Sequence, residues 1–166
     1  MFALSWNNGL TKLCALVGFC LSMYALYVEV SLENNPIYKP FCDVKEYVKC
    51  SSAFLSPYAK GFGIIRYVFG KDTLLNVPNG LTGMVYYALM FALSSSDNRR
   101  ALDALYYLAI VSNLMTVYLA CILVFVIREL CLVCVTTYLV NGLNLLCVLA
   151  KQKARGTGGK ANAKKY

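Results

Sequence analysis

Two pairs of cysteines are the residues of this sequence best suited to chemistry. Cys131 and Cys134 form the motif C-L-V-C, and Cys42 and Cys50 precede it in the chain. A C-x-x-C motif at the start of a helix places its sulfurs about one turn apart, and the unpaired N–H groups there lower the thiol pKa below about 8.5. Because the thiolate is the nucleophile of disulfide exchange, the motif predicts a redox-active pair. The chain has no histidine, so neither the commonest general base nor the commonest zinc ligand is available.

Structural explanations for these cysteines have to be weighed against redox chemistry. The other four of the eight cysteines lie in apolar segments, where cysteine usually packs as a small apolar side chain; they are Cys14, Cys20, Cys121 and Cys147. A structural zinc site is one alternative for the two pairs, but Cys42 and Cys50 lack the spacing of a zinc knuckle. Static disulfides, as in a four-span adhesion protein, are another. A bond within C-x-x-C closes too small a loop to stabilise much, so this alternative explains the second pair poorly.

The composition predicts a protein that is embedded in a membrane. Hydrophobic residues make up 59% of the 166 residues and charged residues 14%, against about 25% charged in an average soluble protein. A helix needs about 20 mostly apolar residues to cross a bilayer. Four segments approach this requirement: residues 10–28, 76–95, 102–127 and 130–150. We therefore predict an all-α integral membrane protein, a bundle of four transmembrane helices that forms a single domain over residues 1–150, with a tight turn at Arg128-Glu129.

Two polar regions flank these spans. Residues 31–75 form a connection too long to be a simple loop, and aromatic, glycine and basic residues alternate over 51–70, which predicts one or two short helices at the membrane interface that cover the bundle as a cap. Residues 151–166 form a basic, glycine-containing tail that we predict to be disordered and to lie against anionic lipid, so nucleic-acid binding is not predicted. Basic residues favour the cytoplasmic side, so both termini are predicted to be cytoplasmic and the loop luminal, where disulfides persist.

A redox pair at the membrane needs an electron partner. The sequence contains no visible nucleotide, flavin or haem motif, so a lipid-soluble quinone held inside the bundle is the expected partner. Asn79 begins the second span, and Tyr138 lies four residues beyond Cys134 on the same helix face. Both can donate hydrogen bonds to quinone oxygens in an apolar pocket without burying a charge. No metal and no tightly bound cofactor are predicted.

Several motifs together resemble the animal vitamin K epoxide reductase family, including its reductase-like paralogue. They are S-M-Y-A-L-Y-V at 22–28, Cys42-Asp43-Val44, Cys50-Ser51, Gly61-Phe62-Gly63, Gly70-Lys71-Asp72, Leu75-Asn76 with Asn79, and C-L-V-C-V-T-T-Y at 131–138. The resemblance runs from Leu21 to Asn141. Two features, Y-V-E-V at 27–30 and the Asn-Pro before Tyr38, favour the paralogue.

The resemblance implies four transmembrane helices in the endoplasmic reticulum membrane, around a quinone pocket below a luminal cap. It also implies a role for each motif residue: Cys131 and Cys134 would be catalytic, Cys42 and Cys50 would relay electrons from luminal thioredoxin-like oxidoreductases, Asn79 and Tyr138 would hydrogen-bond the substrate, and Phe54 would wall the pocket. The sequence departs from the family at Tyr58, preceded by Pro57, where tryptophan usually follows arginine, and at Thr82, where phenylalanine is usual.

The implied reaction is reduction of vitamin K 2,3-epoxide to vitamin K quinone and on to the hydroquinone. Vitamin K is then a substrate rather than a bound cofactor, and anticoagulants of the 4-hydroxycoumarin type are the implied inhibitors. The alternative within enzymes is a quinone-dependent oxidase that runs the same exchange in reverse and forms disulfides in luminal proteins.

Overall fold

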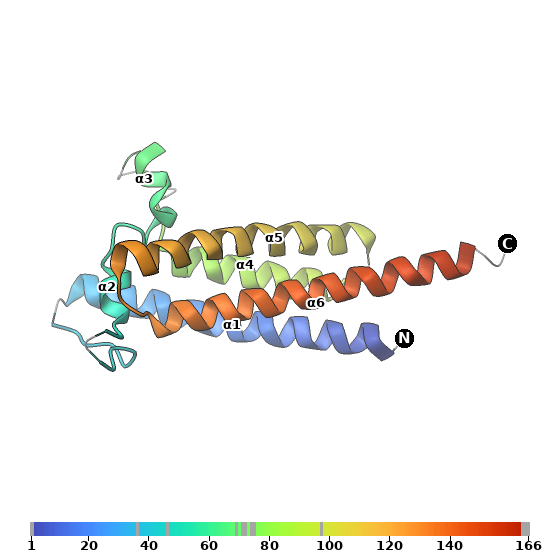
Figure 1. Cartoon of the computed structure of the whole chain (residues 1–166), viewed down its shortest axis with the longest axis horizontal. Helices are drawn as coiled ribbons and strands as arrows, with labels where there is room; N and C mark the ends of the chain where they lie inside the picture. Colours follow the sequence, from blue (N-terminus) through green and yellow to red (C-terminus); the bar gives the residue numbers. More distant parts are fainter. Residues whose placement is uncertain are drawn as a thin grey trace.

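Four long helices run in alternating directions along one bundle. The computed structural model describes residues 2–35, 37–45, 47–68, 70, 73, 76–96 and 98–163. The long helices are α1 (Phe2–Asn34), α4 (Asn79–Ser94), α5 (Arg99–Cys121) and α6 (Leu132–Ala163). The beginning of α1 and the end of α6 lie at the same end of the bundle (Figure 1). The short elements α2 (Cys50–Phe54), η1 (Gly61–Gly63) and α3 (Ile65–Val68) lie toward the opposite end, which we call the cysteine end because both cysteine pairs lie there.

The all-α prediction is confirmed for the described part of the chain, which contains helices and isolated bridges but no strand. Three stretches are long and apolar enough to cross a membrane: Asn8–Asn34, Arg99–Ile127 and Leu132–Ala154. They match the predicted spans 10–28, 102–127 and 130–150. Exposed large apolar side chains such as Leu16, Leu114 and Leu143 cover their outer faces, as expected of helices surrounded by lipid. The predicted span 76–95 corresponds to α4, which has 16 residues and begins only after Pro78.

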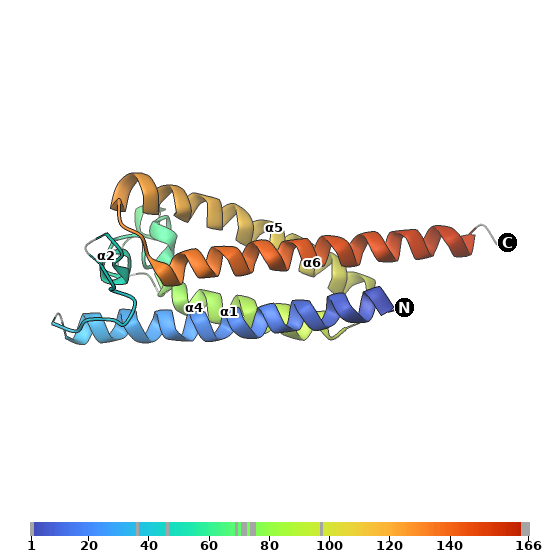
Figure 2. The same ribbon diagram turned by 60° about the horizontal axis from the view of Figure 1, so that its bottom comes forward.

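Small residues bring α1 and α4 into close contact. A Cβ atom on Gly80 would lie 2.8 Å from the backbone nitrogen of Leu26, and one on Gly83 would lie 2.5 Å from Oγ of Ser22. Glycine at these positions therefore lets the two backbones approach, as small residues commonly do between membrane helices. Figure 2 shows α4 lying along α1 over much of its length. This contact fixes the start of α4, and with it Asn79, beside the cysteine end.

The chain reverses tightly between α5 and α6. A π-helical segment, η2 (Ile122–Ile127), extends α5 and ends at Arg128, whose φ of 58° is left-handed. The Arg128 N–H donates to the Leu123 carbonyl at 2.9 Å, which closes the turn. The tight turn predicted at Arg128-Glu129 is thus present, and it delivers Cys131 directly to the start of α6.

Two regions outside the spans complete the fold. The short helices expected within residues 51–70 are present as α2, η1 and α3. α6 continues as helix past Ala150, the end of the predicted span, to Ala163. Disorder of residues 151–166 stays a prediction. Lys151, Gln152, Lys153 and Ala154 follow the last predicted span and are all strong helix formers, which explains why the helix does not stop with the apolar segment.

Candidate active site

The C-L-V-C pair lies at the first turn of α6. Cys131 and Cys134 form a disulfide with their Cα atoms 5.2 Å apart, and the Cys134 N–H points at the Cys131 sulfur at 3.2 Å. Cys131 is completely buried, whereas Cys134 is partly exposed. N–H groups at a helix start stabilise negative charge, so either sulfur would be favoured as a thiolate once the bond is reduced.

The second pair is held by a carboxylate. Cys42 and Cys50 form a disulfide with Cα atoms 5.8 Å apart. Oδ1 of Asp43 accepts hydrogen bonds from the N–H groups of Cys50 at 2.6 Å and Ser51 at 3.1 Å, and its Oδ2 accepts from the Ser51 hydroxyl at 2.6 Å. Asp43 therefore fixes the start of α2 and the position of the Cys50 backbone. Cys42, Asp43 and Cys50 have donor atoms close enough to hold a metal. Here, however, both sulfurs are bonded to each other and the carboxylate is taken up by the backbone.

The two pairs share one apolar cluster. Its buried members are Ala25, Cys42, Cys50, Ala53, Leu123, Cys131 and Val133. The loop of the first pair is also joined to the segment before the second, since Val48 bridges Leu130 and the Lys49 ammonium lies 3.9 Å from the Glu129 carboxylate. The structure thus brings together all four cysteines that the sequence singled out, from segments far apart in the chain.

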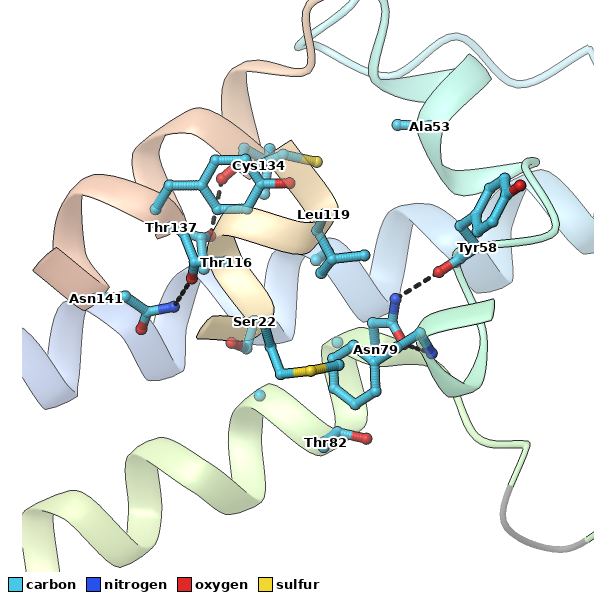
Figure 3. Close-up of a pocket in the computed structure, with 18 of the residues that line it drawn as sticks. Ser22, Ala53, Tyr58, Asn79, Thr82, Thr116, Leu119, Cys134, Thr137 and Asn141 are labelled. Carbon is cyan, nitrogen blue, oxygen red and sulfur yellow. Dashed lines mark hydrogen bonds between the residues drawn. The ribbon is translucent and has the colours of Figure 1, made fainter. Parts of the chain in front are cut away.

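An apolar cavity of about 340 Å³ opens beside the second pair. It lies between α1, α2, α4, α5 and α6, and such a volume is typical of a site for a small organic ligand. Cys134 and Asn79 line it (Figure 3). Phe54 and Tyr138 line it as well. Cys131 is absent from the described lining and is buried in the same cluster as Cys42 and Cys50. Cys134 therefore lines the cavity and packs against the apolar cluster in which Cys131 is buried.

The two predicted hydrogen-bonding residues are in different situations. The Tyr138 hydroxyl has no hydrogen-bonding partner among the described residues, which leaves it available to a ligand in the cavity. Asn79 is already engaged with the cap, because its Nδ2 donates to the Tyr58 carbonyl at 2.7 Å and its Oδ1 accepts from the Phe62 N–H at 2.9 Å. The bond from Asn79 to Tyr58 is drawn in Figure 3. One amide hydrogen of Asn79 remains for a ligand.

An ion pair also fastens the cap. The Lys60 ammonium lies 2.5 Å from the Glu33 carboxylate at the end of α1. The hydrogen bond to Glu33 raises the pKa of Lys60 above its ordinary value. The Gly61 N–H further donates to the Val77 carbonyl at 2.9 Å. The cap is therefore tied to both α1 and the start of α4, directly over the cavity.

Comparison with known proteins identifies the family. A model of the vitamin K epoxide reductase family matches residues 10–149. The chain belongs to the vitamin K epoxide reductase family. It is 39% identical over 130 residues to the vitamin K epoxide reductase complex subunit 1 of Mus musculus, which covers 77% of this chain and 81% of the mouse protein. It is 40% identical over 117 residues to the Rattus norvegicus protein of the same name, covering 70% and 73% of the two chains.

Membership of the vitamin K epoxide reductase family confirms the resemblance drawn from the cysteine and loop motifs, and with it the prediction of a membrane oxidoreductase. Family membership thereby excludes the alternative that the chain is a four-span adhesion protein with static disulfides. The two departures from the family pattern both lie at the cavity. Tyr58 and Thr82 line it, and the Tyr58 ring lies so close to Gly63 that a Cβ atom there would collide with it. The tyrosine at this position is thus packed against the cap turn.

Sequence reasoning missed a polar network deeper in the cavity of this family member. The Tyr87 hydroxyl donates to Oδ1 of Asn141 at 2.7 Å, and Nδ2 of Asn141 donates to the Thr116 hydroxyl at 2.8 Å. Nearby, the hydroxyls of Ser112 and Tyr86 are hydrogen-bonded at 2.9 Å. The signal was available for Asn141, because it follows Cys134 and Tyr138 by seven and three residues and so continues their helix face. Tyr86 and Tyr87 on α4 pair with residues of α5 and α6. This pairing depends on tertiary packing, so the sequence alone does not predict it.

Proposed function

We propose that this chain reduces vitamin K 2,3-epoxide to vitamin K quinone, and the quinone to the hydroquinone. Membership of the vitamin K epoxide reductase family supports this substrate. The observation that carries the proposal is that the two cysteines of the C-L-V-C motif lie in different surroundings. Cys134 lines an apolar cavity beside the Tyr138 hydroxyl, whereas Cys131 is buried in the same cluster as Cys42 and Cys50.

In the first half of the reaction, the Cys134 thiolate attacks a carbon of the epoxide. A carbon–sulfur bond forms, the ring carbon–oxygen bond breaks, and the oxygen becomes negative. Tyr138 and the uncommitted amide hydrogen of Asn79 donate hydrogen bonds to substrate oxygens, which stabilises this charge most where water is excluded. Phe54 forms part of the apolar wall against which the ring lies.

In the second half, the Cys131 thiolate attacks the Cys134 sulfur. The disulfide forms, the electron pair of the carbon–sulfur bond returns to the substrate, and the epoxide oxygen leaves as water with the two protons that the thiols supplied. The substrate has gained two electrons and the cysteine pair has lost two. A second round with a reduced pair adds two electrons and two protons to the quinone.

The second pair then restores the first. The Cys50 thiolate attacks the Cys131 sulfur and releases Cys134 as a thiolate, and Cys42 displaces Cys131 by closing the Cys42–Cys50 disulfide. The burial of Cys50 and Cys131 in one cluster supports this pairing, because neither is accessible to a large reductant from outside. A luminal protein of the thioredoxin type would supply electrons to Cys42 and Cys50.

We further propose that α4 is a fourth span, in the endoplasmic reticulum membrane, with both termini in the cytoplasm and the cysteine end in the lumen. The alternating directions of α1, α4, α5 and α6 support four crossings, and the basic residues near the termini support this orientation. The cavity, with its donors near a reactive sulfur, would also accept 4-hydroxycoumarin anticoagulants in place of the quinone ring.

The decisive experiment is turnover of vitamin K epoxide by the purified chain with dithiothreitol as reductant. We expect conversion to the quinone and its loss in Cys134→Ala, with Cys121→Ala, a lipid-facing cysteine outside the site, as the matched control. Near-normal turnover by Cys134→Ala would refute the assignment. Formation of disulfides in a reduced client protein with added quinone, without epoxide turnover, would favour the oxidase that runs in reverse.

A further inference from the structure

The loop that carries Cys42 exposes large apolar side chains outside the spans. Ile37 is 91% exposed and Phe41 is 93% exposed, and Val44 and Tyr47 are also exposed. None of the four lies in a helix that could face lipid, since they belong to the connection between α1 and α2. Full exposure of a phenylalanine next to a redox-active cysteine is costly in water and is typical of a surface that binds something.

Several contacts hold the described backbone of this loop in place. The Val44 N–H donates to the Val48 carbonyl at 3.1 Å and the Val48 N–H donates to the Lys45 carbonyl at 2.9 Å, which closes a turn. The Cys42–Cys50 disulfide and the Asp43 carboxylate fix one side of the turn. The bridge from Val48 to Leu130 fixes the other side. A partner would therefore meet a surface that is already ordered, which reduces the entropy lost on binding.

Two lysines are exposed in the described part of this loop. Lys39 and Lys45 are exposed, and neither has an ion pair among the described residues. Asp43 is the one carboxylate in the described part of this loop, residues 37–45 and 47–49, and its oxygens are taken up by Cys50 and Ser51. In the described part of the loop, the charged side chains next to the apolar group that no other residue engages are thus the two lysines.

We propose that Ile37, Phe41, Val44 and Tyr47, with Lys39 and Lys45 at the rim, form a docking surface for an electron-donating protein dithiol whose own rim is acidic. The proposal rests on the proposed function and names the partner surface for the same relay. The docked partner lies against Phe41 and so reaches the neighbouring Cys42, which is 8% exposed, rather than Cys50, which is fully buried.

Electrons and protons balance in the disulfide exchange at this surface. A partner thiolate attacks the Cys42 sulfur, a mixed disulfide forms, and Cys50 leaves as a thiolate that takes up a proton. The partner's second thiol loses its proton and attacks the partner's first sulfur in the mixed disulfide, which releases Cys42 as a thiolate that takes up a proton. The partner ends as a disulfide, two electrons poorer, and the loop pair ends as a dithiol.

The test compares two reductants on the same preparations of the full chain in lipid nanodiscs. One is dithiothreitol, and the other is a reduced single-domain protein of the thioredoxin fold with an acidic surface around its C-x-x-C. Phe41→Ser should raise the KM for the protein dithiol about tenfold and leave the dithiothreitol rate unchanged, since apolar anchors dominate such interfaces. Val68→Ser, an exposed apolar residue on α3, is the control and should change neither rate.

Reversing the charge of the two lysines gives an independent test of the docking surface. With the native chain, the KM for the protein dithiol should rise with salt; in a Lys39→Glu, Lys45→Glu variant it should be higher and nearly independent of salt. An unchanged KM in both variants would overturn the docking surface while leaving dithiothreitol-driven epoxide turnover, and hence the proposed function, intact. Equal losses with both reductants would also overturn it, because they would show damage to the loop instead of lost docking.

A bilayer is the competing occupant of the same apolar side chains. In a Trp6→Phe background, Phe41→Trp places the chain's one tryptophan at the surface. Protection of its fluorescence from an aqueous quencher on adding the protein dithiol supports docking. Strong quenching by spin-labelled lipid in the absence of any partner would assign the surface to the membrane and overturn the proposal.

Discussion

The Leu130 N–H donates to the Tyr47 carbonyl at 2.9 Å, which joins the loop of one cysteine pair to the residue before the other. This backbone contact holds the partners of the proposed relay in a fixed arrangement. In Cys42→Ser, Cys50 has no partner in its own pair, so we expect a Cys50–Cys131 disulfide to accumulate when the protein is poised between oxidised and reduced. Mass spectrometry of peptides should detect this linkage. Its absence over the whole range of redox buffers would argue against a direct relay.

Small reductants should bypass the loop pair. Cys42→Ala and Cys50→Ala are expected to lose most turnover with a protein dithiol but to retain a substantial part with dithiothreitol, since a small dithiol can reach Cys134 through the cavity. The measurement is the ratio of the two rates in each variant. A ratio equal to that of the native chain would mean that Cys42 and Cys50 form only a structural disulfide.

Tyr138 contributes a hydroxyl that has no other partner among the described residues. Tyr138→Phe should lower kcat/KM for the epoxide and weaken binding of a 4-hydroxycoumarin inhibitor, by about 0.5–1.5 kcal/mol for one hydrogen bond. Tyr118→Phe, on α5, is the matched control, because Tyr118 does not line the cavity in the described structure. Unchanged kinetics and inhibitor affinity in Tyr138→Phe would remove this residue from the site.

Asn79 should act on the cap as well as on the substrate. Asn79→Leu leaves the Phe62 N–H and the Tyr58 carbonyl without their side-chain partner, at a cost on the order of 1–3 kcal/mol for a group that stays buried. Hydrogen exchange at the Phe62 amide should therefore become faster. Asn35→Ala, an exposed asparagine at the same end, should leave that amide unaffected. Slow exchange in Asn79→Leu would show that other contacts alone hold the cap.

The deep polar network should appear in stability measurements. Asn141→Leu strands the Tyr87 hydroxyl, which is almost fully buried, so the expected loss of unfolding free energy is about 1–3 kcal/mol. Adding Tyr87→Phe removes the stranded group, and the double variant should recover part of the loss. Strictly additive effects in thermal unfolding would mean that the two side chains are not coupled.

The sequence predicted what depends on composition and on local spacing. Apolar length located the spans, and the C-x-x-C motif located the start of α6, because both are properties of a single segment. The four cysteines and the cavity residues Asn79 and Tyr138 were found by spacing and by family resemblance. Their convergence at one end of the bundle is a property of the packed structure.

What the sequence did not predict depends on contacts between distant segments. The Asn79 side chain holds the cap through Tyr58 and Phe62, which precede it by many residues, and nothing local distinguishes such a tether from a helix cap. The continuation of α6 beyond Ala150 was missed for a different reason. Its lysines and glycines suggested disorder, whereas helix propensity and the helix already formed upstream favour another turn.

The shortness of α4 has a consequence for where this protein can reside. Sixteen residues of helix rise about 24 Å, which is less than the hydrocarbon thickness of about 27 Å in the endoplasmic reticulum and much less than the 32–33 Å or so of a plasma membrane. If α4 crosses the bilayer, the lipid must thin around it, at a cost that increases with every ångström of excess thickness. Hydrophobic mismatch at this one helix would then favour a thin membrane over a thick one.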